Sequence, residues 1–274
     1  MMLPLEDLYN DVLAKAQRGL KLDDAAVAQS AGVPLESLIE AKAGNSTNHL
    51  QELASALGIH GPSLAVMAAN GWRPRAVEMT GVAQFNTVFH DMTVNAYVIH
   101  DPITKQAAVF DTSASAEPIL KHIKQEGLSL EYVFITHTHT DHIADLSTLV
   151  SVTPAPKCFT NAQEPADGCI QFQIAEKPEW KLGRLRITAR STTGHSRGGT
   201  TYFIEGLSQP VAIVGDALFA SSMGGGMVSF PEALATNRKE LFTMPDDTIV
   251  CPGHGPMTTI GEEKAHNPFY PEFK

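Results

Sequence analysis

Four side chains that can bind metal ions lie close together near the middle of the chain. His137, His139, Asp141 and His142 all fall within the segment ITHTHTDHIADL. Imidazole nitrogen and carboxylate oxygen are donors that suit zinc, iron or manganese. In extended backbone His137 and His139 point the same way and can chelate one ion. Asp141 and His142 lie where we expect a helix to begin, and they can turn towards a second ion. The chain holds 11 histidines, but three histidines and an aspartate in one HxHxDH string favour a metal site over a polar loop with chance histidines.

Three further candidates lie downstream, each directly after a predicted strand. His195 lies in TTGHSRGG, Asp216 ends PVAIVGD, and His254 lies in CPGHGP. A lone histidine or aspartate at a strand end is more often a satisfied turn residue than a ligand. Strand ends of one sheet, however, deliver side chains to one crevice. The three residues are therefore predicted to join the HxHxDH cluster in a single site.

The elements that must position these residues are short strands mixed with helices. Apolar runs and alternating patterns predict strands, and amphipathic patterns predict helices. The strands are expected over residues 93–101, 106–112, 132–136, 184–190, 200–205, 210–216 and 247–253, and the helices over 116–127 and 230–244. This mixture indicates a layered α/β domain.

The first part of the chain has a different pattern, with helical spacing and no strand signal. Helices are expected over residues 5–16, 23–31, 34–43, 49–59 and 62–70. Asp23 and Asp24 can cap the second of these helices and Gly32 can end it. We therefore expect a small all-α accessory domain over residues 1–75 and a catalytic domain over residues 76–274.

The order of motifs THxHxDH, GH, GD and GHG resembles the metallo-β-lactamase superfamily. Within it, the likeness is greatest to the hydroxyacylglutathione hydrolase (glyoxalase II) branch. The matching strings are THTHTDH (136–142), TGHSRGGTTY (193–202), GDALF (215–219) and PDDTIVCPGHGPMTTIGEEKAHNPF (245–269). The resemblance covers about residues 78 to 274. It implies an αββα sandwich with the metals at one edge.

The resemblance also implies a role for each candidate ligand. The first metal would be held by His137, His139 and His195. The second metal would be held by Asp141, His142 and His254. Asp216 would bridge two divalent ions, with zinc the first expectation and iron or manganese the alternatives. Two cations in this arrangement depress the pKa of a shared water, and the resulting hydroxide attacks a carbonyl carbon. Asp141 would help to orient that hydroxide. The resemblance therefore implies a dinuclear metallohydrolase acting on a thioester or related ester.

Some features separate this sequence from individual branches of the superfamily. Only the 20 residues from Gly255 to Lys274 follow His254, so we do not expect the C-terminal helical extension with which glyoxalase II enzymes bind glutathione. Asp216 argues against lactam hydrolysis, because true metallo-β-lactamases typically lack a bridging aspartate there. Persulfide dioxygenases share the motifs but use one iron, and acyl-homoserine lactonases share all seven ligands.

Arg197 and Tyr202 are candidates to meet an anionic substrate, although a surface arginine and a core tyrosine explain them equally well.

Residues 20 to 60 resemble the helix-turn-helix of phage repressors. The helix that would read DNA bases offers Leu35, Glu36 and Glu40 rather than basic side chains, and residues 1–70 hold eight acids and four bases. Acids facing phosphates weaken DNA binding. We therefore expect these helices to mediate homodimerisation or to shape the mouth of the active site. A DNA-binding regulator with a metal-containing sensor domain is the alternative of another class.

Composition restricts the partners and the location. The net charge is −10, from 20 basic and 30 acidic residues, which disfavours nucleic acid as a substrate. We find no apolar run of the roughly 18 residues that a membrane span needs, and no signal peptide pattern. Cys158, Cys169 and Cys251 are scattered without a CxxC pair, which predicts free thiols in a reducing, cytoplasmic compartment. A small-molecule thioester or ester is the expected partner.

Overall fold

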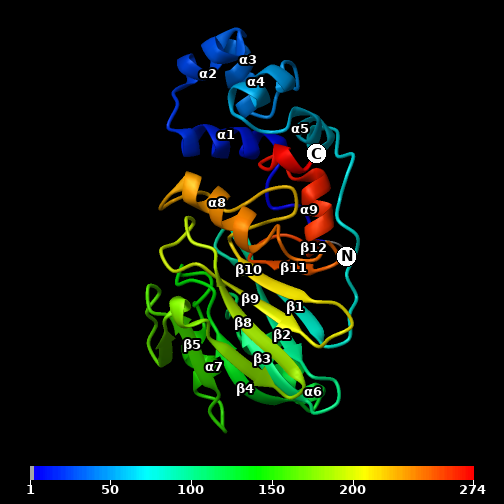
Figure 1. Cartoon of the computed structure of the whole chain (residues 1–274), viewed down its shortest axis with the longest axis vertical. Helices are drawn as coiled ribbons and strands as arrows, with labels where there is room; N and C mark the ends of the chain where they lie inside the picture. Colours follow the sequence, from blue (N-terminus) through cyan, green and yellow to red (C-terminus); the bar gives the residue numbers. More distant parts are fainter. Residues whose placement is uncertain (1–2) are drawn as a thin grey trace.

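Two six-stranded sheets pack face to face and carry helices on their outer sides (Figure 1). The computed structural model describes residues 3–274. The first sheet contains, in spatial order, β1 (Val82–Phe89), β2 (Met92–His100), β3 (Gln106–Phe110), β4 (Ser129–Phe134), β5 (Lys157–Asn161) and β6 (Cys169–Phe172). The second contains β12 (Thr258–Thr259), β11 (Ile249–Pro252), β10 (Val211–Gly215), β9 (Thr200–Glu205), β8 (Leu185–Ser191) and β7 (Glu179–Leu182).

Alternation along the strands divides apolar side chains between two faces of the first sheet. In β2, Tyr97 and Ile99 belong to the core between the sheets, whereas Ala96 and Val98 face the outer helices. Because successive side chains point to opposite faces of a strand, a strand covered on both sides must be apolar throughout. The inner core also takes residues such as Tyr202 from the second sheet.

Helices cover both outer faces of the sandwich. On the first sheet, α6 (Glu117–Gln125) and α7 (Leu146–Val150) contribute residues such as Ile119 and Leu149 to an outer core. On the second sheet, α8 (Phe230–Glu240) and α9 (Ile260–His266) contribute Phe230 and Ile260 to another. Short 3-10 helices lie at Ile174–Glu176 and Pro271–Phe273. The αββα sandwich expected from the sequence is confirmed.

Five short helices precede the sandwich, as the sequence predicts. They are α1 (Tyr9–Leu20), α2 (Asp24–Ala31), α3 (Leu35–Lys42), α4 (Leu50–Ala56) and α5 (Gly61–Ala68). The Asp23 side chain caps α2 by accepting a hydrogen bond from the Ala26 backbone, and Gly32 ends it with a φ of 67°. A boundary at residue 75 between these helices and a catalytic domain stays a proposal. Within residues 3–274, no helix has both the length and the apolar character needed to cross a membrane.

Some expected boundaries were wrong. The helix expected to begin at Asp141 begins at Leu146, so Asp141 and His142 lie in the preceding turn. Five strands, β1, β5, β6, β7 and β12, and the helix α9 were not predicted. β6 and β7 have only four residues each and are partly exposed, so they lack the continuous apolar run by which a buried strand is recognised.

The prediction of three free thiols was also wrong. Cys158 on β5 and Cys169 on β6 form a disulfide. The two cysteines are 11 positions apart, but parallel pairing of the strands puts them directly opposite, with 4.4 Å between their Cα atoms. Cys251 remains free and buried. Cysteine use therefore no longer supports a cytoplasmic location, which stays a prediction.

Candidate metal centre

The seven candidate ligands meet at one rim of the sandwich, and both sheets supply them. The loop after β4 of the first sheet carries His137, His139, Asp141 and His142. The second sheet supplies the other three from the ends of its own strands: His195 between β8 and β9, Asp216 after β10, and His254 after β11. The side chains fall into two groups, each with its donor atoms within 4.8 Å of one another.

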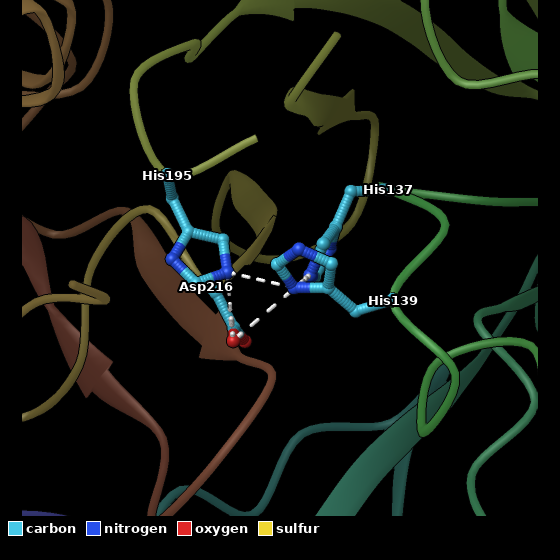
Figure 2. A group of neighbouring side chains, drawn as sticks. All are labelled: His137, His139, His195 and Asp216. Carbon is cyan, nitrogen blue, oxygen red and sulfur yellow. Dashed lines mark hydrogen bonds and ion pairs between the residues drawn. The ribbon is translucent and has the colours of Figure 1, made fainter. Parts of the chain in front are cut away.

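The first group consists of three histidines and one aspartate (Figure 2). The Nδ1 atom of His139 lies 3.0 Å from Nε2 of His137 and 3.1 Å from Nε2 of His195. Asp216 Oδ2 lies 3.3 Å from Nε2 of His195 and 4.0 Å from Nε2 of His137. The four donor atoms therefore converge on one point.

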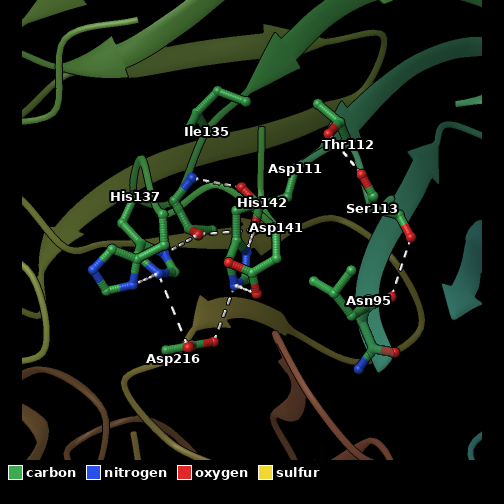
Figure 3. Close-up of polar contacts among 12 residues, drawn as sticks. Asn95, Asp111, Thr112, Ser113, Ile135, His137, Asp141, His142 and Asp216 are labelled. Atoms are coloured by element: carbon green, nitrogen blue, oxygen red, sulfur yellow. Dashed lines mark hydrogen bonds and ion pairs between the residues drawn. The ribbon is translucent and has the colours of Figure 1, made fainter. Parts of the chain in front are cut away.

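The second group consists of Asp141, His142 and His254. Asp141 Oδ2 lies 3.5 Å from Nε2 of His142 and 3.3 Å from Nε2 of His254. Asp216 faces this group as well, with Oδ1 3.2 Å from Nε2 of His142 and Oδ2 3.5 Å from Nε2 of His254. Figure 3 shows the Asp216 carboxylate beside both His137 and His142. One carboxylate thus touches both groups.

The outer ring nitrogens of three histidines are occupied by oxygen atoms. Nδ1 of His195 donates to the Gly225 carbonyl at 2.8 Å, and Nδ1 of His254 donates to the Thr93 carbonyl at 2.6 Å. Nδ1 of His142 donates to Asp111 Oδ2 at 2.8 Å. A neutral imidazole has one N–H and one lone pair, so each of these rings presents a lone pair from Nε2 to the centre. Such outer contacts fix the tautomer and orientation that a metal ligand needs.

The donor set fits a pair of divalent cations. Two ligands at the usual zinc distances in a tetrahedral site lie about 3.3 Å apart, and the contacts above range from 3.0 to 4.0 Å. His142 Nε2 and Asp216 Oδ1 are also buried without a hydrogen-bond partner in residues 3–274. Buried polar atoms without partners are costly and rare. Both atoms would be satisfied by a cation between them.

The charges of the buried carboxylates also favour a cation at the centre. Burial alone would lower the pKa of His142, but Asp216 and Asp111 outweigh it and raise that pKa to about 10. A cation bound at Nε2 would take the place of the proton that this ring otherwise carries. Burial alone would raise the pKa of Asp216, but His254 and His142 hold it well below its usual range. The carboxylates therefore stabilise positive charge at the centre of the site.

Asp111 is part of the centre, although it was absent from the sequence prediction. It follows β3, and its carboxylate accepts hydrogen bonds from His142 Nδ1, from the Thr136 backbone and from Thr136 Oγ1, all at 2.8 Å (Figure 3). It thereby fixes the ring of one ligand and the start of the ligand loop. Its sequence signal is an aspartate directly after an apolar strand, the same signal that identified Asp216.

The two residues proposed to bind substrate lie in different environments. Arg197 is exposed, two residues after His195. Tyr202 is fully buried between the sheets, and its hydroxyl donates to the Ile135 carbonyl at 2.8 Å. Burial and this hydrogen bond assign Tyr202 to the core, so the expectation that it meets substrate is corrected. Arg197 remains a candidate.

Comparison with known proteins finds metal-dependent hydrolases and a persulfide dioxygenase among the relatives of this chain. Residues 91–161 match the sequence profile described as the metallo-beta-lactamase superfamily. A probable metallo-hydrolase of Streptococcus pyogenes serotype M6 is 30% identical over 212 residues, which cover 68% of this chain and 89% of the relative. A hydroxyacylglutathione hydrolase of Methylobacterium nodulans is 27% identical over 63% of this chain and 80% of its own length. The mitochondrial persulfide dioxygenase ETHE1 of Mus musculus is 28% identical, and the match covers 63% of this chain and 69% of that relative.

Solved structures show the same fold. The crystal structure of the B3 metallo-beta-lactamase BLEG-1 superposes with a TM-score of 0.59 and 26% identity, covering 69% of this chain and 100% of that one. The crystal structure of ETHE1 from Myxococcus xanthus gives a TM-score of 0.59 and 27% identity, covering 68% and 83%. Relatives with different reactions therefore share this scaffold, and the reaction must be argued from the site.

Proposed function

The chain belongs to the metallo-β-lactamase superfamily, and from this membership we propose that it is a dinuclear metal-dependent hydrolase of a thioester or related ester, similar to glyoxalase II. The observation that carries the proposal is the complete set of two ligand groups that share Asp216. A single bound ion would leave one group of buried donors without a function.

Each of the seven side chains holds metal in this proposal. His137, His139 and His195 would hold the first cation, Asp141, His142 and His254 would hold the second, and Asp216 would contribute to both. Zinc is the first expectation, with iron or manganese as alternatives. Bound divalent cations lower the pKa of water to near neutrality and polarise a carbonyl oxygen, which is the chemistry that ester and thioester hydrolysis needs.

The protein's own groups supply orientation and charge. Asp141 lies at the edge of the second group, with its side chain 13% exposed, and its carboxylate orients the attacking water. Asp111 keeps the His142 ring directed at the centre through the 2.8 Å contact to Nδ1. The buried Asp216 carboxylate contacts both ligand groups and so would keep the two halves of the centre together.

A thioester is the substrate class that this arrangement suits best. The leaving thiolate departs readily because its conjugate acid has a pKa of about 8.5. The hydroxyacylglutathione hydrolase of Methylobacterium nodulans among the relatives supports this choice. Arg197, exposed beside the His195 loop, offers a cation for an anionic part of the substrate.

The direct test is hydrolysis by the purified chain loaded with zinc or with iron. We expect it to cleave S-lactoylglutathione or another acyl thioester in a small panel that also contains an acyl-homoserine lactone. The His139→Ala variant should lose both activity and bound metal. The matched control is His49→Ala, which removes an exposed histidine in the N-terminal helices. Full activity in a metal-free His139→Ala protein would refute the proposal.

A persulfide dioxygenase is the second candidate, because the mouse ETHE1 protein is as similar as the hydrolases are. The two candidates differ in metal content and in co-substrate. Two ions per chain with thioester cleavage would support the hydrolase. One iron per chain, together with oxygen consumption when a persulfide is added, would contradict the hydrolase proposal and support the dioxygenase.

A further inference from the structure

A buried carboxylate outside the ligand set lies between the two loops that carry the first ligand group. Glu164 lies in the connection between β5 and β6 and is 6% exposed. Its Oε2 atom accepts hydrogen bonds from the Thr138 backbone at 3.0 Å and from Thr138 Oγ1 at 2.6 Å. Its Oε1 atom accepts one from the Gly198 backbone at 2.9 Å. Both oxygens of one side chain are thus committed to two separate loops.

The two loops belong to opposite sheets. Thr138 lies between His137 and His139 in the loop after β4, and Gly198 lies three residues after His195 in the loop before β9. Glu164 therefore ties the first sheet to the second at the place where His139 and His195 must meet. Their facing nitrogens, Nδ1 and Nε2, are 3.1 Å apart.

The backbone at Gly198 packs so closely against the β5–β6 connection that no side chain fits between them. A Cβ atom at this glycine would lie 2.8 Å from Cγ of Glu164 and 2.8 Å from Cβ of Gln163. The backbone of the His195 loop therefore rests directly on the β5–β6 connection. Because this fit is tight, the position of Glu164 fixes the position of the loop.

The charge of Glu164 suits this task. Burial alone would raise its pKa, but the hydrogen bonds from Thr138 and Gly198 lower it below the usual value. An ionised carboxylate accepts at both oxygens and donates at neither. A glutamine at this position would direct an amide N–H₂ at one of the donors, so it would lose one side of the connection.

We propose that Glu164 is a positioning residue for the first metal, because it holds the His137–His139 loop and the His195 loop at the spacing that this metal requires. The inference rests on the metal centre of the proposed function. The second group contacts the protein differently, since His142 is held by Asp111 and His254 by the Thr93 carbonyl. Loss of Glu164 should therefore affect the two metals unequally.

The test compares Glu164→Gln and Glu164→Ala with Asp167→Asn, which removes an exposed carboxylate from the same connection. Chelator competition gives the metal affinities, and anomalous scattering from crystals gives the occupancy of each group. We expect the affinity at the His139 group to fall about 10- to 100-fold in both Glu164 variants. The affinity at the His254 group and both affinities in Asp167→Asn should stay within about twofold.

A second measurement needs no metal. Hydrogen exchange of the Thr138 and Gly198 amides in the metal-free proteins should be faster in both Glu164 variants than in the wild type and in Asp167→Asn. Glu164→Gln keeps the size of the side chain, so it remains informative if Glu164→Ala fails to fold.

The outcomes separate this inference from the function. Unchanged affinity at the His139 group, or equal weakening at both groups, would overturn the positioning role while leaving the hydrolase proposal intact. Unchanged amide exchange in the Glu164 variants would also overturn it. A wild-type chain that takes up no divalent cation would overturn the proposed function and this inference together.

Discussion

Gly253 lies where the backbone of the second sheet comes closest to two candidate ligands. A Cβ atom at this position would lie 2.2 Å from Asp216 Oδ1 and 2.6 Å from Cε1 of His142. Both are side-chain atoms that the metal centre needs in place, so they cannot move aside without leaving it. The absence of a side chain at Gly253 is therefore a requirement of the site.

We predict that Gly253→Ala lowers metal affinity by at least about 10-fold. The physical reason is the displacement of Asp216, which contacts both ligand groups. Isothermal titration with zinc measures the effect. Gly71→Ala is the control, because its added Cβ atom would meet Val66 at an ordinary 3.4 Å. Equal affinity in the two variants would contradict the prediction.

Glu263 on α9 gives a pH dependence to stability. This fully buried carboxyl accepts hydrogen bonds from the Ser221 backbone, Thr258 Oγ1 and Asn267 Nδ2. Burial outweighs these donors and raises the pKa of Glu263 from 4.5 to about 7. The folded state then binds the proton more tightly than the unfolded chain. The stabilisation is complete below about pH 4.5 and is lost as the pH rises through about 7.

We therefore predict that this carboxyl alone lowers the free energy of unfolding by about 2 to 3 kcal/mol between about pH 5 and about pH 8. Urea unfolding of the metal-loaded protein at both pH values measures the change. The Glu263→Gln variant cannot titrate, so its stability should change less over the same interval. Parallel pH profiles for the two proteins would show that Glu263 does not titrate in this range.

The sequence identified the residues that touch the centre better than those that support them. His137 and His139 stand in a dense string, and Asp216 follows an apolar strand, so their types and positions were informative. Glu164 bonds to backbone amides at Thr138 and Gly198. Every residue except proline has such an amide, and the third donor, Thr138 Oγ1, is a common hydroxyl. No pattern of residue types therefore marks the partners, and only the folded chain brings them together.

At the scale of elements, parallel pairing of β5 and β6 determines the role of two cysteines. The register places Cys158 opposite Cys169, and the disulfide closes the connection that carries Glu164. A cross-link restricts the unfolded chain according to the length of the loop it closes. The sequence could not reveal the pair, because the spacing of 11 residues matches no known motif and the strands themselves were not predicted.

We predict that the double variant Cys158→Ala/Cys169→Ala lowers the free energy of unfolding by about 2 to 3 kcal/mol, the value expected for a closed loop of this length. Denaturant unfolding under oxidising conditions measures the loss. The wild-type protein unfolded with a reductant should match the double variant. If the reductant lowers the free energy of unfolding of the wild type no more than that of the variant, the disulfide does not contribute to stability.

The elements that were predicted correctly are those with a strong one-dimensional pattern. β10 is a continuous apolar strand, β9 has an apolar centre and is buried along almost its whole length, and α2 has a capping aspartate and a terminating glycine. β1, by contrast, is mostly half-buried with polar side chains at several positions, so its pattern is weak. It becomes a strand because β2 pairs with it along its full length, which is a tertiary effect.

At the scale of the whole molecule, the N-terminal helices and the second sheet share one apolar core. Val12 and Leu38 of the helices and Phe203 and Val214 of the sheet belong to the same buried cluster. Figure 1 shows α1 beside α8 at this junction. A boundary near residue 75 would therefore divide the chain in sequence but not its core. The role of the helices, whether in dimerisation, at the mouth of the site or on DNA, stays a prediction.

The ion pair of Lys15 and Asp7 secures this junction. Lys15 Nζ lies 2.5 Å from Asp7 Oδ2 and donates to the Met223 carbonyl at 2.8 Å. Both side chains are nearly buried, with exposures of 13% and 11%. Ser222 also donates to Asp7. Removing Lys15 would leave a buried carboxylate without its cation.

We predict that Lys15→Met lowers the free energy of unfolding by about 3 kcal/mol or more. The control Lys42→Met breaks the more exposed pair with Asp24 and should cost less than about 1 kcal/mol. Thermal and urea unfolding measure both. Because the core is shared, the Lys15 variant should still unfold in a single transition. An early, separate transition of the N-terminal helices would contradict the shared core.

The division of the metal ligands between two sheets also limits when the centre can form. His254 lies 117 positions after His137, and it follows β11, whereas His137 follows β4. During synthesis, the first ligands leave the ribosome long before their partners exist. Full loading with metal must then wait until β11 and His254 have been synthesised, and a fully occupied centre reports that both sheets of the sandwich have been assembled.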